Sequence, residues 1–170
     1  MDYLVVVDMQ RDFVDGALGT PEAVSILPRV KSLINEFNGE IIYTRDTHEE
    51  NYLETREGRI LPVKHCVRDS EGWQILPELY KVGSKIFDKP TFGSLELVDY
   101  LASENEREPI GSVTLIGVCT DICVVSNAML IKARFPNIEV LVDSQACAGV
   151  TPDTHVAALT TMKMCQITVK

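Results

Sequence analysis

The passage that decides the fold spans Gly117–Asn127 and reads Gly-Val-Cys-Thr-Asp-Ile-Cys-Val-Val-Ser-Asn. Before it, Ser112–Ile116 is a β-branched and aliphatic run, which is typical of a buried strand. After it the pattern becomes helical, and no Gly or Pro interrupts it until Pro136. Cys123 is therefore expected where a strand has ended and a helix begins. The unpaired N–H groups and dipole of a helix N-terminus lower a thiol pKa, so this position favours a thiolate.

Length and composition indicate the class of protein. The chain has 170 residues, which predicts a single domain over 1–170 with a sizeable core. Its formal net charge of −9 argues against a nucleic-acid-binding surface, which needs a basic patch. No apolar run approaches the ~20 residues of a membrane helix, and the start of the chain lacks the basic region of a signal peptide. Five cysteines are an odd number and indicate a reducing cytoplasm.

Strand-like runs alternate with helical patterns along the chain. The predicted strands span 3–7, 40–45, 84–88, 113–116, 138–142 and 165–169. Helices are predicted over 20–37, where Pro28 should kink or split the helix, over 94–103, after 123 and over 151–164. This order predicts an α/β fold, doubly wound and Rossmann-like, with a six-stranded, mostly parallel sheet and helices on both faces. Residues 46–77 break the pattern, and such long segments are usually functional or partly helical.

Three polar side chains follow predicted strands. Asp8, Lys89 and Cys123 each lie at or just beyond a strand end, so a parallel sheet can bring them together. Taken singly they have ordinary interpretations: a loop-initiating Asp, a solvated Lys and a buried apolar Cys. Together they supply a nucleophile, a base for its proton and a cation that keeps the carboxylate ionised.

Three segments resemble motifs of the isochorismatase-like cysteine hydrolases, the group that contains nicotinamidases. The segments are Val7–Phe13, Lys89–Ser94 and Gly117–Val124. They occur in the family order and with family-like spacing, so the resemblance covers essentially the whole chain. It implies a catalytic triad of Asp8, Lys89 and Cys123. Lys85 is a rival for the lysine, but it lies inside the predicted strand, whereas Lys89 stands at its exit.

The resemblance also concerns the nucleophile loop. The family usually has a non-proline cis peptide here, at Val118–Cys119, and by that analogy the backbone amides of Cys119 and Cys123 form the oxyanion hole. The Cys119 side chain is then a small buried group. A redox pair of Cys119 and Cys123 is the alternative, although their spacing is not the C-x-x-C of thioredoxin-like sites.

A metal site is expected in the irregular segment. Asp46 and His48 are two residues apart at the end of an extended run, so their side chains can share a face. Together with His65 they resemble the metal-binding segments of nicotinamidases, in which the metal binds the ring nitrogen of the substrate. This donor set suits zinc, iron or manganese. Glu57 matches a carboxylate that is a fourth metal ligand in some bacterial nicotinamidases. Alternatively, it is a solvated carboxylate of a charged loop. The third histidine, His155, is expected to be structural or exposed.

Three apolar residues are candidates for a substrate pocket, and the family resemblance implies a function. Phe13, Leu18 and Trp73 are candidates for lining an apolar pocket, although Leu18 could instead anchor its loop and Trp73 could belong to the core. The resemblance implies a cytoplasmic, homo-oligomeric amidase that converts nicotinamide to nicotinate and ammonia through a thioester on Cys123, with neither nucleic-acid nor membrane partners. The alternatives are another hydrolase of the family, acting on a different small amide or carbamoyl group, and a non-catalytic metal- or ligand-binding protein on the same scaffold.

Overall fold

One parallel sheet organises the computed structural model, which describes residues 1–170. Its strands are β1 (Asp2–Val7), β2 (Glu40–Asp46), β3 (Lys85–Lys89), β4 (Ser112–Val118), β5 (Glu139–Ala148) and β6 (Thr168–Val169). They lie in the order β3-β2-β1-β4-β5-β6, and every pair is parallel. The prediction of a six-stranded sheet is confirmed, and the sheet is wholly rather than mostly parallel. The strand order reverses between β1 and β4, which is where ligands bind in such sheets.

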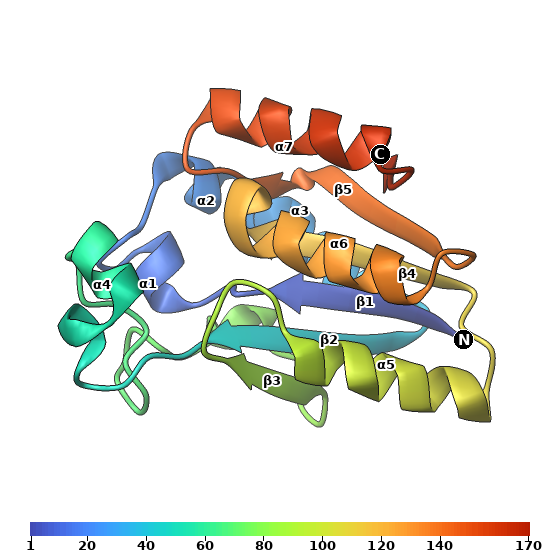
Figure 1. The fold of residues 1–170 in the computed structure, drawn as a ribbon, viewed down its shortest axis with the longest axis horizontal. Coiled ribbons are helices and arrows are strands. Elements are labelled where there is room, and N and C mark those ends of the chain that lie inside the picture. The colour runs from blue at the N-terminus through green and yellow to red at the C-terminus, as the bar shows by residue number, and fades with distance from the viewer.

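Helices cover both faces of this sheet (Figure 1). They are α1 (Arg11–Val14), α2 (Pro21–Ser25), α3 (Leu27–Glu36), α4 (Arg56–Ile60), α5 (Leu95–Arg107), α6 (Val125–Arg134) and α7 (Pro152–Met164). Shorter helical turns are η1 (Tyr52–Glu54), η2 (Pro77–Leu79) and η3 (Thr120–Val124), the last a π-helical turn. The predicted helix over 20–37 is split into α2 and α3, with Pro28 in the first turn of α3, where a missing N–H costs nothing.

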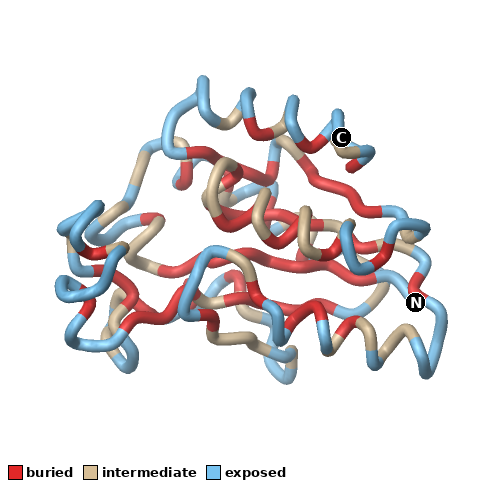
Figure 2. The backbone as a smooth tube through the Cα atoms, in the orientation of Figure 1, coloured by how far each residue is buried: buried red, intermediate tan, exposed pale blue.

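The core lies on the two faces of the sheet. A cluster of 21 buried residues packs β1 and β4 against α5, α6 and α7, and a cluster of 17 packs the other face against α2 and α3. Alternate residues of β1 enter different clusters, Val5 the first and Leu4 the second. The central strands are accordingly buried along their length while the outer helix surfaces are exposed (Figure 2). This burial on both faces explains the continuous apolar run of β1. The structure contains no helix long and apolar enough to cross a membrane.

The segment between β2 and β3 lies for the most part beyond the carboxyl ends of the strands, where Figure 1 shows α1 and α4, and its η2 turn packs against α3. It contains only α4, η1 and η2, so the expectation of a partly helical segment is confirmed. Two isolated bridges hold it in place, an antiparallel one between Gln10 and Ile75 and a parallel one between His48 and Val67.

Candidate active site and metal site

Three strand ends bring the expected triad together. Asp8 follows β1, Lys89 ends β3, and Cys123 lies in η3, directly after β4. The Lys89 and Asp8 side chains are completely buried, and Lys89 Nζ lies 2.6 Å from Asp8 Oδ2. The same ammonium lies 3.3 Å from Cys123 Sγ. The rival Lys85 begins β3 and places its ammonium 4.1 Å from the centre of the Tyr100 ring, away from this cluster.

Burial and neighbouring charges together leave all three pKa values above their ordinary values. Burial raises the pKa of Asp8, and the Lys89 cation only partly offsets it. Burial alone would lower the pKa of Lys89, but the negative charge of Asp8 holds it above its ordinary value, so the side chain stays a cation. Burial and the Asp8 charge raise the pKa of the Cys123 thiol well above 9.0. The sequence-based expectation of a lowered thiol pKa is therefore wrong, because burial outweighs the helix end. The resting thiol is protonated beside a carboxylate that can accept its proton.

The backbone around the triad adopts unusual conformations. Asp8 has φ 49°, in the left-handed region that costs of order 1–3 kcal/mol for most residues. Its Oδ1 accepts a 2.7 Å hydrogen bond from the Thr44 hydroxyl, which fixes the carboxylate. Gly117 has φ 116°, and a Cβ there would lie 2.1 Å from the Val7 carbonyl oxygen, so only glycine fits beside β1. The peptide bond Val118–Cys119 is cis, as the family resemblance implies.

Sequence reasoning assigned no role to Asn127, which is completely buried. Its Nδ2 donates to the Cys123 carbonyl oxygen at 2.8 Å and to the Phe92 carbonyl oxygen at 3.2 Å. Its Oδ1 accepts from the Ser94 backbone N–H at 2.9 Å. Asn127 therefore ties the nucleophile turn to the loop that follows Lys89. Its place in the sequence, four residues after Cys123 on an otherwise apolar helix face, is a signal that could have identified it.

The four expected metal ligands lie together, and one donor atom from each falls within 4.8 Å of all the others. Asp46 Oδ2 lies 3.0 Å from His48 Nε2 and 3.5 Å from His65 Nε2. Glu57 Oε1 lies 3.6 Å from His48 Nε2 and 4.0 Å from His65 Nε2, so Glu57 belongs with the other three. These separations suit donors arranged around one ion at about 2 Å. Burial would raise the pKa of Asp46, but the hydrogen bonds from the two histidines hold it below its ordinary value, as a ligand carboxylate requires.

Backbone contacts orient the two histidines. His65 Nδ1 lies 2.7 Å from the Val63 carbonyl oxygen, so Nδ1–H donates there and Nε2 is left for a metal. The His48 N–H donates to the Cys66 carbonyl oxygen at 2.9 Å, and the Arg68 N–H donates to the His48 carbonyl oxygen at 2.8 Å. The two histidine segments are thereby held side by side.

Two further residues that support the metal site were not predicted. The fully buried Gln10 accepts from the Asp46 N–H at 2.8 Å and donates to the Asp46 carbonyl oxygen at 2.8 Å. Asp12 accepts from the Cys66 N–H at 2.7 Å, beside His65. A Cβ on Gly72 would lie 2.2 Å from the Asp12 carboxylate, so this position is closed to larger residues. Gln10 and Asp12 both lie in the Val7–Phe13 motif, but their contacts to a loop distant in sequence produce no local sequence pattern.

One cavity of about 940 Å³ is lined by the nucleophile of the triad and by three of the four members of the metal cluster. Cys123, Asp46, Glu57 and His65 all contribute to its wall. Its apolar lining includes residues that the sequence did not single out, namely Ile60, Leu61, Phe92, Ile122 and Val150. The cavity is therefore mostly apolar with a few convergent polar groups, as a small-molecule site is.

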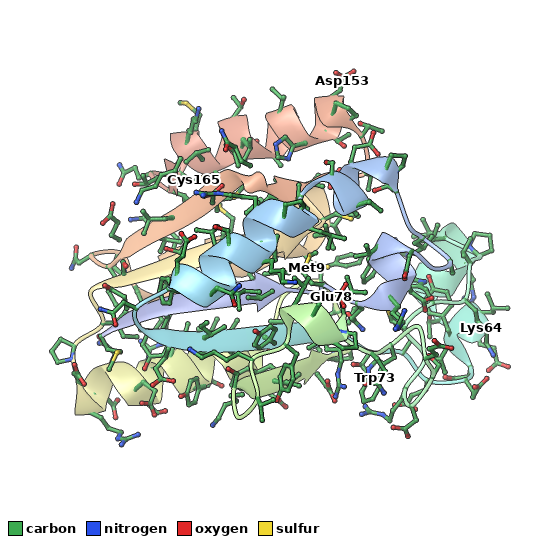
Figure 3. The ribbon with its side chains drawn as sticks, turned by 180° about the vertical axis from the view of Figure 1, so that it is seen from behind. Met9, Lys64, Trp73, Glu78, Asp153 and Cys165 are labelled. Atoms are coloured by element: carbon green, nitrogen blue, oxygen red, sulfur yellow. The ribbon has the colours of Figure 1, made fainter.

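Two of the three predicted pocket residues line the cavity, and the third does not. Phe13 and Leu18 line the cavity, and the Phe13 ring centre lies 5.6 Å from that of His65. Trp73 does not line it and is buried, so of its two expected roles the core one agrees with the structure. Its indole lies on the α3 side of the sheet, near the ends of β2 and β3 (Figure 3), with the Arg45 guanidinium 3.3 Å from the ring centre. His155 also lies outside the cavity, half-buried, with Nδ1 2.8 Å from the Thr120 hydroxyl.

Comparisons with known proteins agree with this geometry. The family model for the isochorismatase domain matches residues 2–170. The isochorismatase family protein PncA of Bacillus subtilis is 30% identical over 170 residues, which cover 92% of this chain and 91% of that protein. The pyrazinamidase of Pyrococcus horikoshii, solved in complex with zinc, superposes with a TM-score of 0.85 at 31% identity, covering 99% of this chain and 98% of that one. The N-carbamoylsarcosine amidase of Thermoplasma acidophilum gives 0.80 at 26%, covering 99% and 95%. The chain therefore belongs to the isochorismatase family.

Proposed function

We propose that the protein is a metal-assisted amidase that hydrolyses nicotinamide to nicotinate and ammonia. The observation that carries the proposal is the shared cavity, whose wall contains the Cys123 thiol as well as Asp46, Glu57 and His65. A small aromatic amide in this cavity can present its carbonyl carbon to the thiol and its ring to the metal ligands. The pyrazinamidase of Pyrococcus horikoshii, a relative in complex with zinc, supports both the reaction class and the choice of metal.

The metal ligands are Asp46, His48, Glu57 and His65. Two carboxylates and two imidazoles suit zinc, and iron or manganese are the alternatives. When bound, the metal acts as a Lewis acid that takes the ring nitrogen and so orients the amide. The apolar wall around it, which includes Phe13 and Leu18, receives the ring.

The first half-reaction forms a thioester. Asp8 accepts the Cys123 proton as the sulfur attacks the carboxamide carbon. The backbone N–H groups of Cys119 and Cys123 stabilise the oxyanion. Asp8 then returns the proton to the leaving nitrogen, the C–N bond breaks and ammonia departs. Throughout, the Lys89 cation, 2.6 Å from Asp8 Oδ2, stabilises the ionised carboxylate.

The second half-reaction hydrolyses the thioester. A water molecule attacks the acyl carbon while Asp8 takes one of its protons. The C–S bond then breaks, Cys123 recovers its proton from Asp8, and nicotinate is released. One amide and one water thus yield one carboxylic acid and one ammonia, and the enzyme returns to its starting state.

Ammonia release from nicotinamide by the purified protein tests this proposal. We expect release by the wild-type protein, loss of release on chelation and recovery on addition of zinc. Replacing Cys123→Ala should abolish release, whereas Cys165→Ser, at a cysteine outside the cavity, should leave it unchanged. Undiminished release by the Cys123→Ala variant would sink the nucleophile assignment, and release that survives complete chelation would sink the metal assignment.

A second candidate is hydrolysis of a larger amide or a carbamoyl group by the same machinery. The observation in its favour is the cavity of about 940 Å³, near the upper end of pockets that enclose drug-sized ligands and larger than one ring needs. The similarity to N-carbamoylsarcosine amidase supports it as well. A higher kcat/KM for N-carbamoylsarcosine than for nicotinamide would favour this candidate.

A further inference from the structure

Two adjacent residue pairs close the carboxyl ends of β2 and β3. In the parallel register, Arg45 lies opposite Asp88, and Asp46 lies opposite Lys89. Successive side chains of a strand point to opposite faces, so Asp46 and Lys89 share the catalytic face and Arg45 and Asp88 share the other. On the catalytic face, Lys89 Nζ lies 3.5 Å from Asp46 Oδ1. This pair is where the catalytic triad meets the metal site.

The strand that carries Lys89 is weakly anchored by the sheet itself. β3 is five residues long, lies at the sheet edge and pairs with β2 alone. Edge strands with one neighbour depend on side-chain contacts for their position. Besides the strand ladder and the 3.0 Å hydrogen bond from the Thr47 N–H to the Lys89 carbonyl oxygen, the separation of Asp46 and Lys89 therefore depends on the side chains that join β2 to β3 on the opposite face.

On that face Arg45 and Asp88 form a bidentate ion pair. Arg45 Nε donates to Asp88 Oδ1 at 2.7 Å, and Nη2 donates to Oδ2 at 3.0 Å. Only 14% of the Arg45 side chain and 29% of the Asp88 side chain are exposed, so solvent screens this pair less than a surface pair. A planar guanidinium with two parallel hydrogen bonds fixes distance and direction together, which an ammonium does not.

Trp73 holds the guanidinium from outside the sheet. The Arg45 guanidinium carbon lies 3.3 Å from the centre of the buried Trp73 ring, a close cation–π contact. The indole N–H donates to the Thr47 hydroxyl at 2.8 Å, and that hydroxyl donates to the Arg45 carbonyl oxygen at 3.0 Å. The Trp73 carbonyl oxygen accepts from Gln10 at 2.9 Å. Trp73 thus links Arg45 to the support of Asp46.

We propose that Arg45, Asp88 and Trp73 form a positioning clamp that sets the separation of Asp46 from Lys89, and so couples the geometry of the metal site to that of the triad. None of the three touches the cavity. Arg45 and Asp88 act on Asp46 and Lys89, which follow them in sequence, and Trp73 acts through its contact with Arg45. The outer partners of metal ligands act in the same indirect way. The clamp rests on the proposed function, because it acts on the ligand Asp46 and on the triad residue Lys89.

The test measures zinc affinity as well as activity. Zinc dissociation constants are determined by competition with a chromophoric chelator, well below the melting temperature, for Arg45→Ala, Arg45→Lys, Asp88→Ala and the double variant of Arg45→Ala with Asp88→Ala. Outer partners of metal ligands typically contribute 10–100-fold to metal affinity, so we expect losses of about that size in the two alanine variants. The double variant should lose no more than either single variant, and Arg45→Lys should be intermediate.

The matched control is Arg29→Ala, which removes a 2.7 Å ion pair to Asp143 between α3 and β5. It should lower the melting temperature while leaving zinc affinity within about twofold of wild type. Zinc affinity and kcat/KM of Arg45→Ala equal to those of Arg29→Ala would overturn the clamp while leaving the amidase proposal intact. If the wild-type protein releases no ammonia from nicotinamide but Arg45→Ala still weakens zinc binding, the clamp is supported and the assignment of nicotinamide as substrate is overturned. A wild-type protein that binds none of zinc, iron and manganese would overturn both.

Discussion

The proposed active site has two halves that are built differently. The nucleophile half consists of Asp8, Lys89 and Cys123. The metal half consists of Asp46, His48, Glu57 and His65. In the nucleophile half, Asp8 and Lys89 lie at strand ends and Cys123 lies in the turn η3 that follows β4, and none of the three is more than 5% exposed. In the metal half only Asp46 belongs to a strand, and 24% of the Glu57 side chain is exposed.

This difference shows which interactions each half depends on. In the nucleophile half, the sheet fixes the backbone and the charges stabilise one another in a dry environment, so removing one charge should be severe. In the metal half, the backbone follows an irregular path, so individual hydrogen bonds accepted by Gln10, Asp12 and the Val63 carbonyl oxygen hold the ligands or the residues next to them. Graded losses of metal affinity are expected there.

The largest effect should come from Lys89→Met, which keeps the bulk of the side chain but leaves Asp8 buried without its counter-charge. Breaking a buried ion pair by removing one partner costs about 3–5 kcal/mol of unfolding free energy, and turnover should be lost. Urea unfolding and ammonia release measure the two effects. A double variant, Asp8→Asn with Lys89→Met, should recover much of the stability but none of the activity. Full stability in the single variant would contradict the account of the nucleophile half.

Gln10→Ala should have the next largest effect, on the metal half. It leaves the buried N–H and carbonyl groups of Asp46 without their side-chain partner, which costs about 1–3 kcal/mol. Zinc affinity should fall about 10–100-fold because the ligand is no longer held. Chelator competition measures the affinity. Gln74→Ala, at an exposed residue of the same loop whose side chain makes no hydrogen bond within the protein, is the control and should change neither quantity. Equal zinc affinity in the two variants would contradict the support assigned to Gln10.

The same contrast explains what the sequence could and could not predict. Asp8, Lys89 and Cys123 stand next to apolar strands, so the local pattern places them at one sheet edge. Gln10, Asp12 and Asn127 act on residues far away in sequence or through backbone groups, and no periodicity reveals that. Trp73 was left between two roles for a related reason. An aromatic residue in an irregular segment suits either a pocket or the core, and only the register that sets Arg45 opposite Asp88 decides between them.

The pH dependence of stability should separate the two halves in chelated, metal-free protein. The pKa of Asp46 is lowered in the folded state because the histidine hydrogen bonds outweigh burial, so its contribution is present above pH 3.8 and is lost as the pH falls further. The pKa of Asp8 is raised, mainly by burial, so its contribution has the opposite sign: it is greatest at low pH and declines as the pH rises through the folded-state pKa.

Urea unfolding of wild type, Asp46→Asn and Asp8→Asn between pH 3 and pH 6 measures these contributions. As the pH falls toward 3, the stability of wild type relative to Asp46→Asn should decrease. Over the same range, the stability of wild type relative to Asp8→Asn should increase. Parallel pH profiles for the two variants would show that the two carboxylates have the same environment, contrary to the structure.

The smallest effect should come from Trp73→Phe, which decides between the sequence-based and the structural interpretation of this residue. An aromatic ring is kept beside Arg45, and the 2.8 Å hydrogen bond to the Thr47 hydroxyl is lost, which costs about 0.5–1.5 kcal/mol. Because Trp73 lies outside the cavity, KM for nicotinamide should stay within about twofold of wild type. Phe13→Leu, which changes the cavity wall, should raise KM and so provides the contrast. If KM rises as much in Trp73→Phe as in Phe13→Leu, Trp73 contributes to the substrate pocket, contrary to the structure.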